Sequence, residues 1–156
     1  MSDANQINRT KDLLVEVDEK ENLGASIIDP NALVSLQQQS QFTQLTVPKV
    51  DTGYVINIIT SSATNTDDLF VSRMFAPTML LESEDPVCGS AHCLLTPYWC
   101  EKCGIAPGQE VSAKQVSARG GNIRAIWDDV NGTVKLRGQG AIFATGQCQT
   151  GILADT

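Results

Sequence analysis

The sequence has few basic residues and no basic cluster. Lysine and arginine together number 11 against 18 aspartates and glutamates, which gives a formal net charge of −7 at pH 7. A protein that binds nucleic acid needs a face rich in lysine and arginine to neutralise the phosphates. The basic residues here are scattered along the chain. The sequence therefore argues against nucleic acid as a partner.

Long hydrophobic runs are also missing. No apolar stretch approaches the roughly 20 residues that a helix needs to cross a bilayer, and the first residues, MSDANQINRTKDLL, lack the regions of a secretory signal. We therefore expect a soluble, cytoplasmic protein with no membrane partner. The 156 residues, 42% of them hydrophobic, suffice for one domain with a core. We expect a flexible N-terminus over residues 1–10 and a single domain over residues 11–156.

Side chains that bind metals or form disulfides are scarce. The chain has one histidine, His92, and five cysteines. An odd number of cysteines without an export signal argues against a disulfide framework. Cys100 and Cys103 form a CxxC pair, but a structural zinc site usually takes two such pairs. The chain also lacks a phosphate-binding loop and a dinucleotide fingerprint, so we expect neither a metal nor a cofactor.

Short β-rich runs lie on both sides of one apolar segment. Branched and aromatic residues predict strands in KDLLVEVDE, GYVINIITSSA and DLFVSRMFAP before it, and in QEVSAKQVSA, GNIRAIWDDV and TVKLRGQGAIFATG after it. GYVINIITSSA and DLFVSRMFAP are expected to pair. Apolar and polar residues alternate on both sides of Asn131-Gly132, which is typical of a hairpin. A short helix is expected in DPNALVSLQQQ.

The apolar segment, from Gly89 to Lys102, predicts the main helix. Apolar residues cover most of its circumference, and they are Ala91, Cys93, Leu94, Leu95, Pro97, Tyr98, Trp99 and Cys100. Such a helix must be buried on nearly every side, and Gly104 is well suited to end it. We therefore expect an α+β fold in which a curved sheet or barrel surrounds this helix.

The stretch EDPVCGSAHC at residues 84–93 is the strongest candidate for a functional site. Pro86 and Gly89 turn the chain sharply before the helix, so the first backbone N–H groups, those of Gly89, Ser90 and Ala91, lack intrahelical acceptors. A helix start of this kind attracts carboxylate or phosphate, and glycine lets a ligand approach the backbone closely. The sequence therefore predicts an anion pocket.

Three side chains of this stretch allow a chemical role and a structural one. Asp85 can transfer a proton or contact a substrate, and it can equally cap the N–H groups of the helix. Cys88 stands where the helix dipole favours the thiolate, although a buried inert thiol is the commoner fate. His92 can reach the rim of the pocket or serve as a hydrogen-bonded core residue. The residues alone leave these alternatives open.

Three motifs, in this order, resemble the phenazine-biosynthesis-like (PhzF-like) isomerase family. They are FVSRMFAP at 70–77, EDPVCGSAHCLLTPYW at 84–99 and QVSARGGNI at 115–123. NRTKDLLVEVD at 8–18 is similar to the stretch that opens the second, C-terminal half of those proteins. The resemblance implies a diaminopimelate epimerase-like fold. Each half of that fold is α+β, with a mixed, strongly curved, barrel-like sheet wrapped around one central apolar helix.

The resemblance also implies roles for individual residues. Asp85, Gly89 and Ser90 match the DPxTGSA motif of the family, which implies substrate contact or proton handling at the mouth of the helix. Cys88 replaces the more frequent threonine, and CGSA is thereby similar to the CGTG of racemases whose thiol exchanges a proton next to a carboxylate. The expected ligand is a small carboxylate-bearing metabolite. The expected catalytic residues are Asp85 and Cys88, and the expected substrate-binding residues are Gly89, Ser90, Ala91 and His92.

Length separates this chain from the family that it resembles. Family members are two-domain proteins of nearly twice this size, with a catalytic glutamate and a GH motif in a first half that has no match here. Glu82 and Glu84 belong to the loop itself. An enzyme would need a second copy, as a homodimer, or a partner that supplies the missing half. The alternatives are a module that binds small ligands or partners without turnover, and a fragment with an exposed apolar face.

Overall fold

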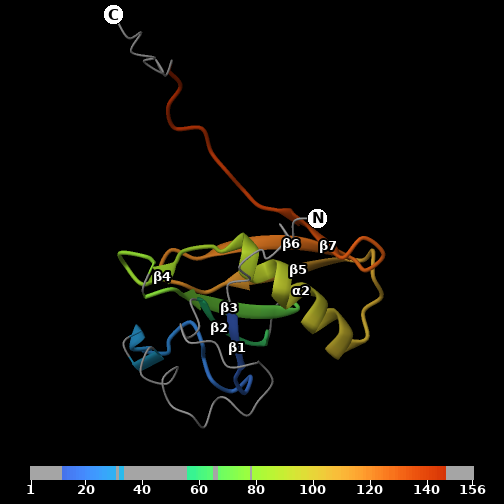
Figure 1. Cartoon of the computed structure of the whole chain (residues 1–156), viewed down its shortest axis with the longest axis horizontal. Helices are drawn as coiled ribbons and strands as arrows, with labels where there is room; N and C mark the ends of the chain where they lie inside the picture. The colour runs from blue at the N-terminus through green and yellow to red at the C-terminus, as the bar shows by residue number, and fades with distance from the viewer. Residues whose placement is uncertain (1–11, 31, 34–55, 65–66, 78, 147–156) are drawn as a thin grey trace, which may run out of the picture.

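The computed structural model describes residues 12–30, 32–33, 56–64, 67–77 and 79–146 (Figure 1). The flexible terminus predicted for residues 1–10 lies outside them. Most of the short helix predicted in DPNALVSLQQQ does too, but Pro30, Ala32 and Leu33 are helical. Among the described helices, none is long and apolar enough to cross a membrane.

The described strands form one mixed sheet. Their bounds are Asp12–Glu16 for β1, Ile56–Ser62 for β2, Phe70–Phe75 for β3, Glu84–Asp85 for β4, Glu110–Gln115 for β5, Gly121–Asp128 for β6 and Thr133–Arg137 for β7. The order is β1-β2-β3-β5-β6-β7, with β4 also paired to β3. The β1–β2 and β3–β5 pairs are parallel, and the others are antiparallel. Each predicted strand is confirmed, and so is the pairing of β2 with β3.

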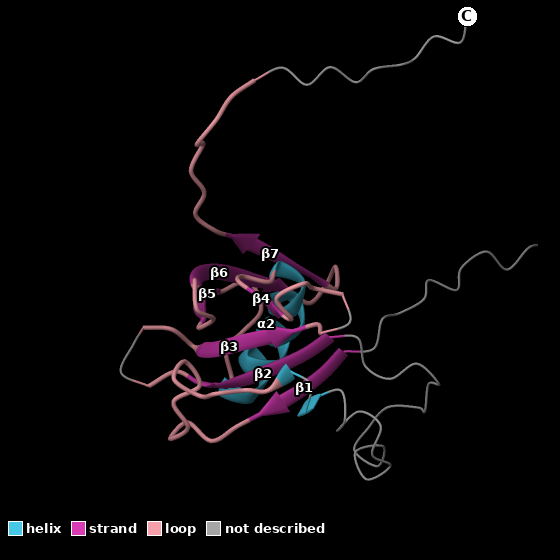
Figure 2. Cartoon of the chain, turned by 90° about the vertical axis from the view of Figure 1, so that its left-hand side faces the viewer, coloured by secondary structure: helices cyan, strands magenta, loops and turns pink. Residues whose placement is uncertain are grey.

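The hairpin between β6 and β7 turns at Asn131 and Gly132, as predicted. Gly132 has a φ of 61°, which glycine adopts without strain, and the Asp128 carboxylate accepts hydrogen bonds from the Asn131 backbone at 3.1 Å and side chain at 2.8 Å. The last strand is shorter than the predicted run. Residues 138–146 are exposed, have no regular structure and lead away from the body of the protein (Figures 1 and 2).

The helix α2, Gly89–Cys103, lies against the concave face of the curled sheet (Figure 2). It ends at Gly104, whose left-handed φ of 66° confirms the predicted stop. One part of the prediction is wrong, because the helix is not buried on nearly every side. Cys93 is exposed and Leu94 is 46% exposed, because the sheet is a half-barrel that covers one side of the helix.

The main core lies between α2 and the strands β2, β3 and β5. Trp99 stacks on Phe70 with ring centroids 6.0 Å apart, and its indole N–H donates to Thr60 Oγ1 at 3.0 Å. Leu95 fills the same core and is 0% exposed. Full burial of each such side chain contributes about 1.5–3 kcal/mol. The predicted α+β fold, a mixed and strongly curved sheet around one central helix, is confirmed.

Candidate functional site

The stretch singled out in the sequence forms the sharp connection between β4 and the start of α2. The two residues of β4 pair with Met74 and Phe75 of β3. Asp85, at the end of β4, is half-buried, and its Oδ1 accepts a hydrogen bond from the Val87 backbone N–H at 2.8 Å. Of the two alternatives for Asp85, the one in which it caps the helix is therefore wrong, because its carboxylate closes the turn one step before α2.

Cys88 is the residue that caps α2. It has an extended backbone, with φ −97° and ψ 110°, and its Sγ accepts a hydrogen bond from the Ala91 N–H at 3.4 Å. The same sulfur lies 3.2 Å from the Ser90 hydroxyl oxygen. Cys88 is 5% exposed. Its thiol thus lies beneath the mouth of the helix, in contact with a hydroxyl that reaches the surface.

The first two N–H groups of α2 belong to exposed residues and have no partner among the described residues. Gly89 and Ser90 are both exposed, and no described residue accepts a hydrogen bond from either backbone N–H. Unpaired donors at the positive end of a helix dipole are suited to a carboxylate. Asp85, Cys88, Gly89 and Ser90 therefore meet within one turn of the chain, with two free donors at the surface.

The other two expected substrate-binding residues lie deeper. Ala91 is 2% exposed and His92 is 0% exposed. The His92 Nδ1 lies 2.7 Å from the Cys88 carbonyl oxygen, which can only accept, so Nδ1 carries the hydrogen. Burial lowers the pKa of His92. The ring is therefore neutral at pH 7 and points into the core, and a contact of Ala91 or His92 with a substrate stays a prediction.

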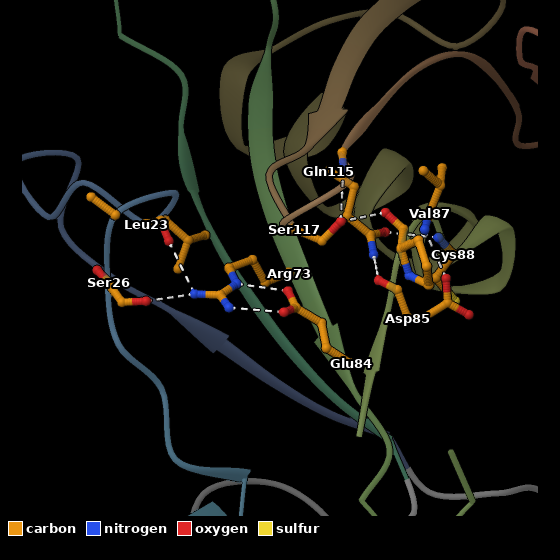
Figure 3. A network of polar contacts seen from close by, with 12 residues as sticks. Leu23, Ser26, Arg73, Glu84, Asp85, Val87, Cys88, Gln115 and Ser117 are labelled. Carbon is orange, nitrogen blue, oxygen red and sulfur yellow. Dashed lines mark hydrogen bonds and ion pairs between the residues drawn. The ribbon is translucent and has the colours of Figure 1, made fainter. Parts of the chain in front are cut away.

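Two residues that sequence reasoning did not assign hold this loop from the far side. The Gln115 amide, fully buried, accepts from the Cys88 N–H at 2.8 Å and donates to the Asp85 carbonyl oxygen. The Ser117 hydroxyl donates to the Pro86 carbonyl oxygen at 2.7 Å (Figure 3). Both belong to QVSARGGNI, a motif noted in the sequence without a role for any of its residues.

A groove beside the start of α2 has a cationic rim. Its volume is about 520 Å³, and its lining includes Val87, Gly89, Arg119, Asn122, Leu136 and Arg137. Arg137 forms an ion pair with Glu110 at 2.9 Å. No described residue forms a hydrogen bond or ion pair with the Arg119 side chain. The groove combines apolar walls with positive charge, which suits a small organic acid.

No group of three or more histidine, cysteine, aspartate or glutamate side chains that could hold a metal ion occurs in the described part of the chain. The cysteines Cys88, Cys93, Cys100 and Cys103 are free thiols. Cys100 is buried and Cys103 is exposed at the end of α2. The groups available for chemistry at the mouth of α2 are therefore a carboxyl, a thiol, a hydroxyl and backbone N–H donors.

Known proteins are similar to this chain in sequence. An uncharacterized isomerase of Halalkalibacterium halodurans is 39% identical over 113 residues, which cover 72% of this chain and 35% of that protein. The human phenazine biosynthesis-like domain-containing protein is 42% identical over 77 residues, which cover 49% of this chain and 25% of that protein. The chain thus spans about a third or less of these relatives.

Solved structures agree. A putative phenazine biosynthesis PhzC/PhzF protein from Clostridium difficile matches with a TM-score of 0.64 and 34% identity, over 88% of this chain and 44% of that one. A PhzF family protein from Enterococcus faecalis matches with a TM-score of 0.56 and 31% identity, over 84% of this chain and 45% of that one. The family model for the phenazine biosynthesis-like protein (PhzC-PhzF) matches residues 4–146. Since that match covers the sheet, the helix and the loop before it, the chain belongs to the phenazine biosynthesis-like protein family.

Proposed function

We propose that this chain is the C-terminal half of an isomerase or epimerase-type enzyme that moves a proton on a small carboxylate-bearing metabolite. The observation that carries the proposal is that four groups lie within one turn of the chain. They are the unpaired N–H donors of Gly89 and Ser90, the Asp85 carboxyl and the Cys88 thiol. A relative that is named an isomerase supports the reaction class. In this proposal, residues 11–156 form one domain.

The proposed reaction needs a group that takes a proton from the substrate and a different position or face of the substrate to which a proton returns. The substrate carboxylate binds the N–H groups of Gly89 and Ser90, and Arg119 adds positive charge at the groove. Asp85 or Cys88 accepts a proton from the carbon next to the carboxylate, and a proton returns to a different position or face. Positioned acid and base groups of this kind contribute about a hundred- to ten-thousand-fold. The product is an isomer, so the reaction consumes no oxidant, reductant or cofactor.

The proposal also includes a second side of the active-site cleft, the second wall, which would face the mouth of α2. It is supplied either by a second copy of the chain or by a partner with the other half. Ile142 and Phe143 support an assembly, because they are 86% and 100% exposed in the segment that leaves the body of the protein. Apolar side chains exposed to this degree gain free energy when a partner covers them. A cytoplasmic location, where thiols stay reduced, fits a chemical role for Cys88.

A binding module without turnover is the second candidate. The observation that favours it is the state of Cys88, which is 5% exposed and engaged as the cap of α2. A thiol whose task is to hold a helix start has a sufficient structural reason to be there. Such a protein would bind small carboxylates at the N–H groups of Gly89 and Ser90 and exchange no substrate hydrogen.

The deciding experiment measures deuterium incorporation into small amino and hydroxy acids in heavy water. The isomerase proposal expects incorporation by the wild type and its loss in at least one of Asp85→Asn and Cys88→Ser. The exposed Asp129→Asn and Cys103→Ser make the same chemical changes away from the loop and are expected to leave it unchanged. Saturable binding of these acids without incorporation would establish the second candidate instead.

A parallel measurement of solution mass tests the assembly. If a second copy completes the site, light scattering over a dilution series gives a dimer for the wild type and a monomer after Ile142→Ser with Phe143→Ser, whereas a wild-type monomer points to a separate partner. Leu81→Ser is the control, because Leu81 is 103% exposed on the loop before β4 and lies outside the exposed segment. A wild-type monomer that incorporates deuterium unaided would contradict the need for a second wall.

A further inference from the structure

A fully buried amide joins both ends of the loop that carries the candidate chemical groups. Gln115 is the last residue of β5, and its side chain is 0% exposed. Its Oε1 accepts from the Cys88 N–H at 2.8 Å, and its Nε2 donates to the Asp85 carbonyl oxygen. Figure 3 shows the side chain reaching across from β5 to the loop. One planar group thus bridges the two residues to which the proposed function assigns proton transfer.

We propose that Gln115 is the positioning residue of this site, and that its amide sets how Asp85 and Cys88 are presented at the mouth of α2. The inference rests on the proposed function for the chemistry. The two hydrogen bonds that the Gln115 amide forms with Asp85 and Cys88, called the clamp below, are a property of the loop and can be tested alone. A planar amide has a fixed separation between its oxygen and its nitrogen. The Asp85 carbonyl and the Cys88 N–H therefore cannot move apart without leaving a buried polar group unsatisfied, which folded proteins avoid.

Neighbouring contacts support the clamp. Ser117 donates to the Pro86 carbonyl at 2.7 Å and accepts from the Gly120 N–H at 3.0 Å. A Cβ placed on Gly121 would overlap the Val87 side chain, so that side chain already lies against the backbone. The loop is thus held at successive residues by the segment 115–121, which runs from the end of β5 to the start of β6. Among these contacts, the Gln115 amide is the one that reaches both Asp85 and Cys88.

The chemistry of the clamp explains why glutamine suits the position. Leucine is apolar and one bond shorter, and it offers neither a donor nor an acceptor. Glutamate has the same shape and accepts from Cys88, but it donates to the Asp85 carbonyl only when it is protonated. Burial raises the pKa of a carboxyl, so Gln115→Glu gives a complete clamp at low pH. At high pH the ionised carboxylate of the same variant repels the Asp85 carbonyl oxygen, so the hydrogen bond to Asp85 is lost and the clamp opens.

The first arm of the test observes the Cys88 backbone N–H by NMR, without any substrate. In Gln115→Glu its proton shift and protection from exchange are expected to match those of the wild type at about pH 5 and to depart from them at about pH 8. Gln109→Glu is the matched control, because it is the same change at an exposed residue just before β5. A Cys88 N–H that stays like the wild type in Gln115→Leu, which removes both hydrogen bonds at either pH, would overturn the clamp.

The second arm compares deuterium incorporation by folded protein at the same two pH values. Relative to the wild type at each pH, Gln115→Glu is expected to lose about a hundredfold in kcat at about pH 8, with little change in KM, and to recover it at about pH 5. Gln115→Leu is expected to recover at neither pH. Circular dichroism on the same samples separates this pattern from unfolding, which would lower activity in proportion to the unfolded fraction.

The two proposals fail in different ways. If the wild type incorporates no deuterium, the proposed function fails, and the Cys88 N–H shift alone decides whether Gln115 clamps the loop. If the wild type is active and folded Gln115→Leu keeps the wild-type kcat at both pH values, the positioning role is overturned while the proposed function stands.

Discussion

Arg73 and Glu84 form a two-pronged ion pair across the neighbouring strands β3 and β4. Arg73 Nε lies 2.7 Å from Oε1 of Glu84, and Arg73 Nη2 lies 2.9 Å from Oε2. The side chains are only 12% and 17% exposed. Arg73 also donates to the Ser26 carbonyl oxygen at 2.6 Å (Figure 3). A single guanidinium therefore ties the first loop of the described chain to the strand that leads into the candidate site.

Glu84→Gln is expected to lower the free energy of unfolding by about 2 kcal/mol, because it leaves a largely buried guanidinium without its charged partner. Urea denaturation followed by circular dichroism measures this. Glu110→Gln is the control, since Glu110 pairs with Arg124 and Arg137, which are 68% and 71% exposed. Exposed pairs contribute less than about 1 kcal/mol, and equal losses in the two variants would contradict the prediction.

The stability of the protein is expected to fall as the pH drops below about 6.5, the ordinary pKa of histidine. His92 is the one histidine of the chain, and burial lowers its pKa in the folded state. The unfolded chain therefore takes up a proton at a pH where the folded chain does not, which favours unfolding. Urea denaturation at about pH 7.5 and about pH 5.5 measures the loss, away from the carboxyl range near pH 4.

His92→Asn is the comparison for this pH dependence. The asparagine amide can still donate to the Cys88 carbonyl oxygen in place of Nδ1, but it does not titrate. The variant is expected to lose much of the difference in stability between the two pH values, whatever its stability at neutral pH. An unchanged difference would show that groups other than His92 cause the pH dependence.

Gly121→Ala is expected to destabilise the protein by about 1–3 kcal/mol, because the added methyl group overlaps the Val87 side chain. Val87→Ala in the same chain removes the overlap and is expected to restore part of the loss. Thermal denaturation of the two single variants and the double variant forms a mutant cycle. Gly140→Ala is the control, since nothing lies within 4 Å of its added Cβ. Simple additivity of Gly121→Ala and Val87→Ala would refute the contact.

The cap made by Cys88 predicts an order of stability. Cys88→Ala is expected to lose about 1 kcal/mol, because the Ala91 N–H loses its acceptor, whereas serine is among the best capping residues and Cys88→Ser is expected to be at least as stable as the wild type. Urea denaturation gives the order. Equal stability of the alanine and serine variants would mean that the sulfur does not cap the helix.

The elements of the fold could be predicted from the sequence where neighbouring residues determine them. Gly104 ends α2 and Asn131-Gly132 turns the last hairpin because local backbone conformation requires such residues there. The exposed side of α2 could not be predicted. Apolar side chains such as Leu94 indicate that the helix surface favours burial, but they do not determine how far the sheet curls around the helix.

The position of the candidate site in the chain could be predicted from the sequence, but the contacts within the site could not. The turn before α2 follows from Pro86 and Gly89. Asp85 was a natural candidate for the cap, but its carboxylate reaches the Val87 N–H and leaves the cap to Cys88. Gln115 bonds to Cys88 across 27 residues of sequence. A pairing of that separation depends on strand order, which local patterns do not contain.

Glu16, at the end of β1, accepts hydrogen bonds from the Tyr98 hydroxyl and the Lys102 ammonium group, both on α2. These partners are 82 and 86 residues away in sequence, and among the described strands β1 pairs only with β2. Contacts between distant residues form late, because the loop between them must close first. We therefore expect β1 to join the described part of the structure late, after β2 and α2 have built the surface that receives it.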